Sequence, residues 1–533
     1  MSRLSTMSAS PWTPFRYRAF AVLWSAMVIS NIGTWMNSVG AGWLMATLDP
    51  DPLMVALVQA ATTTPIFLLA LTAGAVADIV DRRRLLLVVN GLMALVATAM
   101  ALLVTSGQMT ALRLLVSIFL LGCGMAFIAP AWQAIVPQLV PKEALSRAIT
   151  LHSLGINISR AVGPAVAGVL IVTLGMAAPF AINAASFLAI VAGLLWWRPP
   201  TQLTSRLPPE GIFEALRNGL SYVRYSTPVR ATLIRAVAIF LFASAYWALL
   251  PVIAKTWLGG GARLYGILLG SVGVGAVLGA LLLPRIKRQL GADVTVAVGT
   301  AGTALVLAAF SLIADPYAAV AASLVAGICW IFVVSSLLVS AQTALPNWVR
   351  ARGLSVFLTL FFGSMAIGSV IWGKTASELG IDTALLIAAG GALITIPLTW
   401  HARLGQGEEL DLTPSLHWPD PMVLTEATEE RGPVMTIIEY RIAHEDVPQF
   451  LTLMREMARA RRRSGAVQWG VMEDAADPDL YLEYFIERTW LAHLRHHERV
   501  AGTDRAIQER VHRLHRGSAP PSVRHLLAPR GGR

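Results

Sequence analysis

Twelve apolar stretches, each about 20 residues or longer, constrain this chain more than any other feature of its sequence. A helix needs about 20 mostly apolar residues to cross the hydrocarbon core of a bilayer, where no water is available to bind exposed backbone groups. The stretches therefore predict twelve membrane-spanning helices within the first 400 residues. They lie near 20–46, 53–77, 85–105, 112–136, 148–173, 177–197, 231–254, 264–284, 293–314, 317–341, 353–374 and 382–400.

The composition excludes an ordinary soluble protein. Hydrophobic residues make up 55% of the chain and charged residues 14%, with a mean hydropathy of +0.62, whereas soluble domains carry about 25% charged residues. The net charge of +11 indicates basic cytoplasmic loops rather than nucleic-acid binding. Cys123 and Cys329 lie inside apolar stretches, which excludes a disulfide framework and a cysteine metal site. The polar N-terminus predicts no cleaved signal peptide.

Lysine and arginine side chains predict the orientation in the membrane. With the N-terminus inside, the inner segments hold nineteen of them and the outer segments hold four. Cytoplasmic connections are enriched in these residues. We therefore expect a multi-pass protein of the cell (inner) membrane with both termini in the cytoplasm.

A repeated motif divides the membrane region into two related halves. Gln133-x-x-x-Pro137 near the end of the fourth span recurs as Gln342-x-x-x-Pro346 at the end of the tenth, an offset of 209 residues. A shift of six spans preserves orientation, so the halves are expected to be parallel repeats. Between them, apolar residues at helical spacing predict an amphipathic helix at the inner membrane surface. The expected divisions are 1–197 (first half), 198–230 (linker helix), 231–400 (second half), 401–432 (second linker) and 433–529 (soluble domain).

The soluble domain is predicted to have mixed secondary structure. Alternating apolar residues indicate strands, and two longer amphipathic stretches indicate helices, in the order βαββαβ that is typical of a ferredoxin-like fold. The strands are expected near 434–442, 466–472, 480–486 and 523–527, and the helices near 444–463 and 490–515. The expected fold class is an all-α membrane protein of twelve spans with a small α+β cytoplasmic domain.

The connection between the second and third predicted spans carries the most distinctive motif. Asp78 lies at the end of the second predicted span, where the helix dipole disfavours an acid unless the acid has a partner. Three arginines follow shortly after Asp78. The motif is similar to the signature Gly-x-x-x-Asp-Arg-x-Gly-Arg-Arg of the major facilitator superfamily. Gly74, Asp78, Arg82 and Arg83 match that signature, whereas Ile79 and Asp81 depart from it.

Within that superfamily the chain resembles the enterobactin-exporter-like subgroup, also called transmembrane secretion effectors. The resemblance rests on Asp81, on 129–137 and 157–164, and on a C-terminal domain similar to antibiotic-biosynthesis monooxygenases. It implies a secondary transporter, without a cofactor or catalytic residues, that exports a small amphipathic metabolite, siderophore-like compound or drug by proton-coupled alternating access. It also implies a gating loop in which Asp78 docks near 350–353 when the cytoplasmic side closes.

Two alternatives remain open at this stage. The arginines after the second span also suit a plain basic loop that only sets the topology of the chain. The chain also suits a membrane-anchored enzyme or regulatory protein whose activity lies in its C-terminal domain.

Arg160 lies deep inside the fifth predicted span. It follows the start of that span by 13 residues, or roughly 20 Å of helix, and a central arginine costs about 2.5–3.5 kcal/mol on insertion scales. Arg160 is therefore expected either to face a wet cavity, where it meets an anionic or hydrogen-bonding substrate, or to bind backbone carbonyls of a neighbouring helix. Asn157 shares its helix face, and Gly163 with Pro164 predict a kink.

Polar and aromatic side chains in other spans complete the expected cavity. Asn31 and Trp35 lie on one stripe of the first span, and Gln133 and Gln342 belong to the repeated motif. Each of them alone also suits a helix–helix contact. No Asp or Glu lies in the middle of a predicted span, so proton coupling is implied by the resemblance, with His152 as a proton site or a structural histidine.

Histidines of the C-terminal domain raise the question of a metal site. His493 and His497 stand at i and i+4 on a predicted helix, a spacing that can bind zinc. No third ligand is evident, and Arg495 and Arg499 would repel a cation, so no metal site is expected. The domain is instead expected to regulate transport or to self-associate, because an open sheet of this size usually covers its free face. The expected partners are a small-molecule substrate, the lipid bilayer and a second copy of the domain, with no nucleic acid.

Overall fold

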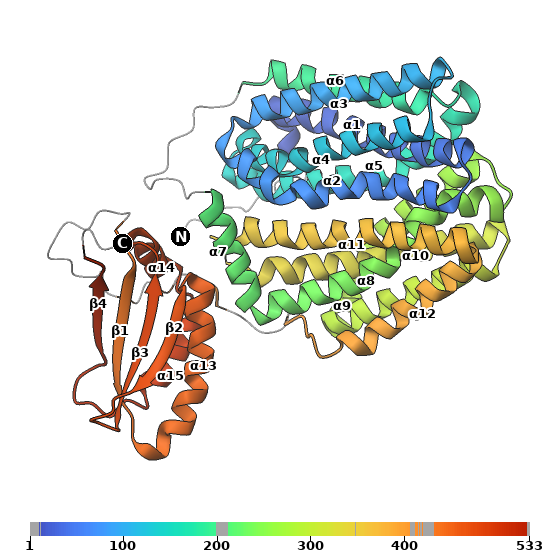
Figure 1. Cartoon of the computed structure of the whole chain (residues 1–533). Helices are drawn as coiled ribbons and strands as arrows, with labels where there is room; N and C mark the ends of the chain where they lie inside the picture. The colour runs from blue at the N-terminus through green and yellow to red at the C-terminus, as the bar shows by residue number, and fades with distance from the viewer. Residues whose placement is uncertain are drawn as a thin grey trace, which may run out of the picture. The chain divides into compact units, whose positions relative to one another are not determined.

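A bundle of long helices makes up most of the described chain. The computed structural model describes residues 10, 12–198, 212–346, 348–405, 411–413, 415, 418 and 431–529. Within these residues, eleven helices are long and apolar enough to cross a membrane, and they lie side by side in one bundle (Figure 1). They are α1 (Arg18–Leu48), α2 (Pro52–Ile79), α3 (Arg82–Thr105), α4 (Ala111–Leu139), α5 (Lys142–Leu174), α6 (Ala178–Trp196), α8 (Thr227–Val252, continued by a π-helical turn Ile253–Trp257), α9 (Ala262–Leu312), α10 (Pro316–Thr343), α11 (Arg350–Leu379) and α12 (Ile381–Thr399).

Helix α9 accounts for two of the twelve predicted spans. Its 51 residues would extend roughly 75 Å as a straight helix, more than twice the ~30 Å hydrocarbon core of a bilayer. The helix is interrupted at Gly291, which has φ 75° and ψ 172°. Glycine adopts a positive φ without the steric cost that other residues meet. The predicted spans 264–284 and 293–314 lie on either side of this glycine, so α9 supplies both.

Close backbone approaches join the two halves along α5 and α9. A Cβ atom at Gly266 would lie 2.7 Å from the carbonyl oxygen of Pro164 and 2.9 Å from Cα of Gly168. A Cβ at Gly273 would lie 2.5 Å from Cα of Ala161. Because real Cβ atoms do not approach other atoms this closely, glycine is required at both positions. The predicted kink residues Gly163 and Pro164 therefore lie beside this contact, within a helix that continues past them.

The two halves also meet where α1 ends and α2 begins. The ammonium group of Lys255 donates a hydrogen bond to the carbonyl oxygen of Ala46. A Cβ at Gly373 would lie 2.5 Å from the Cβ of Ala56, so α11 packs against the first turns of α2. These contacts join the two halves at that end of the bundle.

A buried ion pair stabilises the second half. Arg235 counts among the basic residues expected on the inner side, but its side chain is buried in α8 and lies 2.8 Å from Asp293 of α9. Its Nε also donates to the carbonyl oxygen of Thr399, at 3.3 Å, near the end of α12. The charge of Arg235 therefore links three helices.

The C-terminal domain has the strand order expected of a ferredoxin-like unit. Its antiparallel sheet runs β2-β3-β1-β4, with helices between the strands. The elements are β1 (Val434–Arg441), a 3-10 turn (His444–Asp446), α13 (Val447–Ser464), β2 (Gln468–Glu473), β3 (Leu480–Glu487), α14 (Trp490–Arg499), α15 (Gly502–His512) and β4 (Ser522–Leu527). The single helix predicted near 490–515 is wrong, because Val500 and Ala501 have extended backbone and separate α14 from α15.

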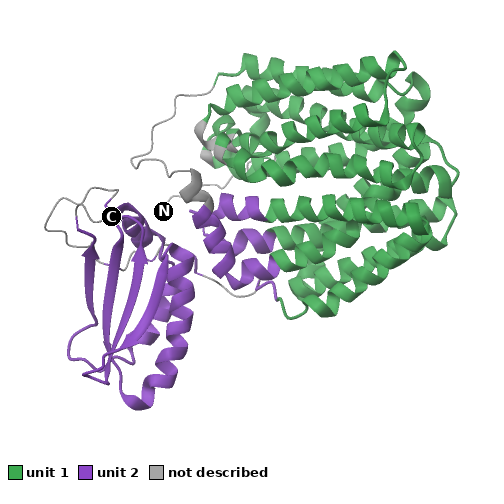
Figure 2. Cartoon of the chain, in the orientation of Figure 1, with its two compact units in different colours: residues 1–208, 233–338, 357–402 green, residues 209–232, 339–356, 403–533 purple. Residues whose placement is uncertain are grey.

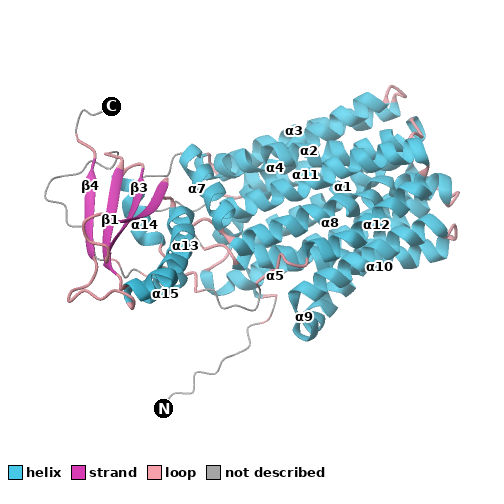
Figure 3. Ribbon diagram, turned by 60° about the horizontal axis from the view of Figure 1, so that its bottom comes forward, coloured by secondary structure: helices cyan, strands magenta, loops and turns pink. Residues whose placement is uncertain are grey.

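One face of the sheet is buried beneath helices, as Figure 3 shows. Burial alternates along β1 and β3, which places Ile438, Tyr440 and Phe485 in a core with Phe450 and Met454 of α13. The opposite face is also rich in apolar side chains. These include Met435, Ile437, Leu482, Tyr484 and Ile486, all partly exposed.

The chain divides into two compact units, coloured in Figure 2. One contains residues 1–208, 233–338 and 357–402, and the other contains 209–232, 339–356 and 403–533. The second unit therefore combines the C-terminal domain with α7 (Ile212–Tyr225) and with the connection between α10 and α11.

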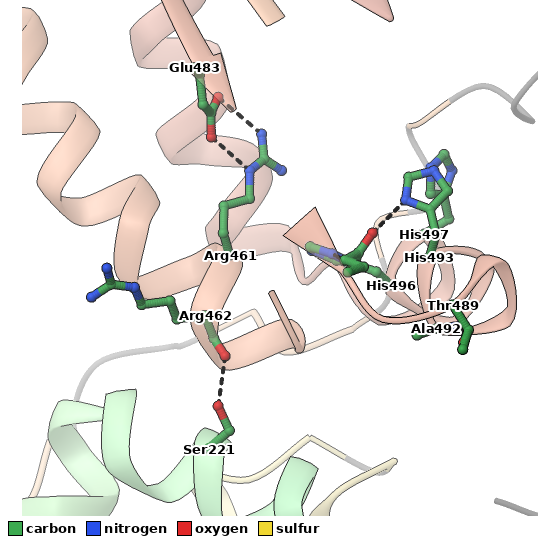
Figure 4. Close-up of polar contacts among 10 residues, drawn as sticks. Ser221, Arg461, Arg462, Glu483, Thr489, Ala492, His493, His496 and His497 are labelled. Carbon is green, nitrogen blue, oxygen red and sulfur yellow. Dashed lines mark hydrogen bonds and ion pairs between the residues drawn. The ribbon is translucent and has the colours of Figure 1, made fainter. Parts of the chain in front are cut away.

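Helix α7 packs against α13 within the second unit. The hydroxyl of Ser221 donates to the carbonyl oxygen of Arg462 at 2.9 Å (Figure 4), and the Arg462 guanidinium lies over the ring of Tyr225. The hydroxyl of Tyr222 donates to the carbonyl oxygen of Ala344. The expected linker helix thus has a protein contact as well as an exposed side, where Leu220 is 59% exposed.

Candidate transport cavity

A cavity of about 530 Å³ lies inside the helix bundle and is lined by helices of both halves. This volume is within the range of roughly 300–1,000 Å³ that is usual for small-molecule sites. Aromatic rings form part of its wall. They belong to Trp35, Trp132, Phe187, Trp247, Tyr265, Trp330, Phe361 and Phe362.

The predicted cavity residues divide into two groups. Asn31, Trp35, Gln133 and Arg160 line the cavity. Asn157 lies outside the set of lining residues, and its amide donates to the Ser153 carbonyl oxygen of its own helix at 2.9 Å. Gln342 is also outside that set, on the exposed end of α10.

Arg160 is the only lysine or arginine among the described lining residues, which include no Asp or Glu. Its guanidinium carbon lies 5.6 Å from the centre of the Trp35 ring, a distance typical of a cation–π contact. Its Nε atom is buried without a hydrogen-bond partner among the described residues. A Cβ at Gly163 would lie 2.6 Å from the Cβ of Trp35, so this glycine allows α1 and α5 to approach closely. The arrangement leaves the guanidinium available to a ligand.

Further polar atoms in the wall lack protein partners among the described residues. They are Asn37 Oδ1, Asn90 Oδ1, Asn183 Nδ2 and Trp247 Nε1. A buried polar group without a hydrogen bond is costly, so such atoms favour water or a polar ligand in the cavity. The sequence analysis missed Asn37 and Asn90; an amide inside an apolar stretch is the signal that could have found them.

His152 lies beside Trp132 in the cavity wall. The indole Nε1 of Trp132 donates to Nδ1 of His152 at 3.3 Å. An imidazole that accepts at Nδ1 is neutral and carries its proton on Nε2. The contact therefore supports a structural role for His152, because uptake of a proton would occur at Nδ1 and break the hydrogen bond from Trp132.

Two residues of the predicted gating loop have local roles. The carboxylate of Asp81 accepts a hydrogen bond from the backbone NH of Arg84 at 2.7 Å and so caps the start of α3. Arg83 donates to the carbonyl oxygens of Leu194 and Leu195, at 2.6 and 2.9 Å. Cations at helix C-termini are favourable, so Arg83 stabilises the end of α6.

For Gly74 and Arg82, no such contact is found among the described residues. Gly74 lies in the last turns of α2, and Arg82 is the first residue of α3. The side chain of Asp78, and with it the expected docking near 350–353, lies outside the described residues.

A buried ion pair lies in the C-terminal domain. Arg461 binds Glu483 through Nε at 3.0 Å, as Figure 4 shows, and both side chains are almost fully buried. Tyr440 and Trp469 also donate to the Glu483 carboxylate. Trp469 therefore belongs to a structural network.

A bundle of paired helical halves with a small-molecule cavity inside it defines the chain as a membrane transporter of the major facilitator class. The chain matches the transmembrane secretion effector family over residues 9–531, and it belongs to that family. The match includes the C-terminal domain. The family and the relatives named below are transporters rather than enzymes, so the chain is a secondary efflux transporter.

Named relatives share large parts of the sequence. The chain is 28% identical over 270 residues to the staphyloferrin A transporter of Staphylococcus aureus, covering 50% of this chain and 67% of that protein. It is 26% identical over 404 residues to the multidrug efflux pump Tap of Mycolicibacterium fortuitum, covering 73% and 96%. It is 24% identical over 398 residues to the enterobactin exporter EntS of Citrobacter koseri, covering 73% and 92%.

Solved structures support the fold. A crystal structure of a variant of the nucleoside transporter NupG is similar with a TM-score of 0.60 and 14% identity. The similarity covers 72% of this chain and 99% of that one. At this identity the likeness concerns the fold alone.

Proposed function

We propose that this transporter exports an anionic, amphipathic small molecule of siderophore-like chemistry across the inner membrane. The observation that carries the proposal is Arg160, the one Lys or Arg among the described lining residues, in a wall that is otherwise neutral and aromatic. Relatives named for staphyloferrin A and for enterobactin favour the same substrate class.

Charge and shape in the cavity would select such a substrate. A charge-assisted hydrogen bond from Arg160 to a carboxylate or phenolate contributes about 1.5–3 kcal/mol. The Trp and Phe rings offer flat apolar surface for aromatic or aliphatic parts of the molecule. The amide groups of Asn37, Asn90 and Asn183 supply both acceptors and donors for hydroxyl or amide groups of the substrate.

The proposed orientation places both termini in the cytoplasm. It follows from nineteen basic residues on one side of the membrane against four on the other. In that orientation, the end of the bundle where Lys255 binds Ala46 faces outward. Alternating access would then open that end while the loop containing Asp78, Arg82 and Arg83 closes the other.

Proton coupling is also part of the proposal. The described cavity lining contains no carboxylate, so the candidate proton site there is Nδ1 of His152, which would take up a proton by giving up the hydrogen bond from Trp132. Protonation of this imidazole would add a positive charge to the cavity beside the substrate. Outward release of an anion would then be linked to the charge state of His152.

The C-terminal domain is proposed to self-associate through its free sheet face. That face contains Met435, Ile437, Leu482 and Tyr484 and is not covered by the helices of the domain. A second copy of the same face would bury these side chains in an isologous contact. Chemical cross-linking in membranes, with Ile437→Lys as the disrupting variant, tests this part.

The substrate class is tested by transport in proteoliposomes with an imposed pH gradient. The panel pairs each anionic compound with a neutral analogue, for example a tricarboxylate with its triester and a tris-catecholate with its methyl ether. We expect accumulation of the anionic members that a protonophore abolishes. Equal transport of the neutral analogues would favour a general multidrug pump, and transport of neither set would overturn the proposal.

A further inference from the structure

Three imidazoles from two separate elements come together in the C-terminal domain. His493 and His497 lie one turn apart on α14, with their Nε2 atoms 3.1 Å apart, and Figure 4 shows the two rings side by side. His525 comes from β4, and its ring centre lies 4.8 Å from that of His493. One ligand nitrogen of each histidine lies within 4.8 Å of the others. The third ligand that the sequence did not reveal is therefore His525.

The geometry is close to that of a tetrahedral metal site. Zinc–nitrogen bonds of about 2.0–2.1 Å place neighbouring ligand nitrogens roughly 3.3–3.4 Å apart. The separation of 3.1 Å between His493 and His497 is near this value. A small side-chain rotation of His525 would complete three corners of the tetrahedron.

A buried carboxylate orients one of these histidines. Glu487, 1% exposed, accepts a hydrogen bond from Nδ1 of His493 at 2.5 Å, so Nε2 is the atom of that ring that faces the cluster, where it is hydrogen-bonded to Nε2 of His497. Metal-binding histidines usually have such a carboxylate behind them, because it fixes the tautomer and increases the basicity of the ligand nitrogen. Thr489 caps α14 through the NH of Ala492 and holds the helix that carries the pair (Figure 4).

The electrostatic surroundings suit a cation. Glu487 accepts a further hydrogen bond from Nδ1 of His496 at 2.6 Å, so its buried carboxylate lies against two imidazoles beside the cluster.

Of the two arginines expected to repel a cation, Arg495 and Arg499, the second is engaged in another contact. Its guanidinium lies 4.3 Å from the centre of the Trp348 ring, a contact outside the three-histidine cluster. Thr436 supplies a polar group without a described partner next to His525 in the sheet. Thr436, 2% exposed, is paired with His525 in the register of β1 and β4, and its hydroxyl has no hydrogen-bond partner among the described residues.

We propose that His493, His497 and His525 bind one divalent transition-metal ion of the zinc class, with Glu487 as the positioning residue for His493. Three imidazole ligands favour Zn²⁺ and its neighbours Co²⁺, Ni²⁺ and Cu²⁺ over Mg²⁺ and Ca²⁺, which prefer oxygen. The fourth position is open to water, with the hydroxyl of Thr436 as a hydrogen-bond partner for it. The ion would tie β4, the last strand of the sheet, to α14.

The test uses the full-length transporter in detergent, purified without a polyhistidine tag and stripped with a chelator. We expect one Zn²⁺ per chain in a competition titration with a chromophoric chelator. Addition of Co²⁺ should give the visible absorption of a tetrahedral site. His525→Ala and His497→Ala, changed on different elements, should each lower the affinity at least 100-fold, and the exposed His444→Ala should leave it unchanged.

The positioning role of Glu487 predicts a different experimental result from that of a ligand. Glu487→Gln should retain the tetrahedral Co²⁺ spectrum while the affinity falls roughly 10- to 100-fold. A wild-type protein that binds none of the four ions would overturn the proposal. Wild-type affinity in both His525→Ala and His497→Ala would overturn it as well.

Discussion

Replacing Arg160 with glutamine should weaken the binding of anionic substrates selectively. The substitution removes the only Lys or Arg among the described lining residues but keeps a polar side chain of moderate length. The lost charge-assisted hydrogen bond is worth about 1.5–3 kcal/mol, which corresponds to roughly 10- to 150-fold in Kd. Neutral analogues of the substrate should bind with little change.

The same substitution should leave the thermal stability nearly unchanged. The described contact of the Arg160 guanidinium is with Trp35, and a cation–π contact contributes about 0.5–2 kcal/mol. Removing a charge from the middle of a span also removes its free-energy cost of membrane insertion, about 2.5–3.5 kcal/mol on insertion scales. The two changes oppose each other, so a large fall in Tm is not expected.

Both quantities are measured on purified protein in nanodiscs, with Kd determined for an anion and for its neutral ester. Arg160→Lys, which keeps the charge but not the planar donor pair, should give an intermediate Kd. Asn157→Ala is the matched control, because this neighbour on α5 does not line the cavity. A loss of equal size for the ester and the anion would refute the reasoning, as would an unchanged Kd together with a lower Tm.

Three further substitutions test other parts of the structure. Asp78→Asn should abolish transport at normal expression, and efflux at the wild-type rate would exclude the proposed gate. Gly266→Val should prevent the close contact of α5 with α9 and reduce both yield and transport, whereas Gly91→Ala, with nothing within 4 Å of the new Cβ, should behave as wild type. Glu483→Gln should destabilise the C-terminal domain by about 3–5 kcal/mol, because it leaves the charge of Arg461 buried without its partner; hydrogen exchange of strand β3 would measure this.

The sequence predicted the features that the bilayer enforces most strongly. Hydrocarbon excludes unsatisfied backbone and charge, so spans appear as apolar stretches and Arg160 stands out by its cost. Even the two predicted spans that the structure joins within α9 are separated by the positive φ of Gly291. The βαββαβ order was predictable because strand and helix periodicities differ along the chain.

Side-chain surroundings were less predictable, because they depend on contacts between distant segments. Asn157 shares a helix face with Arg160, yet it binds its own helix. Gln342 repeats Gln133 by position in the motif, but a repeat carries over topology and not the neighbours of a side chain. His525 is 28 residues from His497, and only the pairing of β4 with β1 brings it beneath α14.

The composition of the second compact unit bears on how the transporter could be controlled. Its membrane-helix segments all belong to the second half of the bundle: the first residues of α8, the last of α10 and the first of α11. Under the proposed alternating access, these segments would move with the second half, and they share one compact unit with the domain. Any partner that immobilises the domain, including another copy of it, would slow that movement without contacting the substrate.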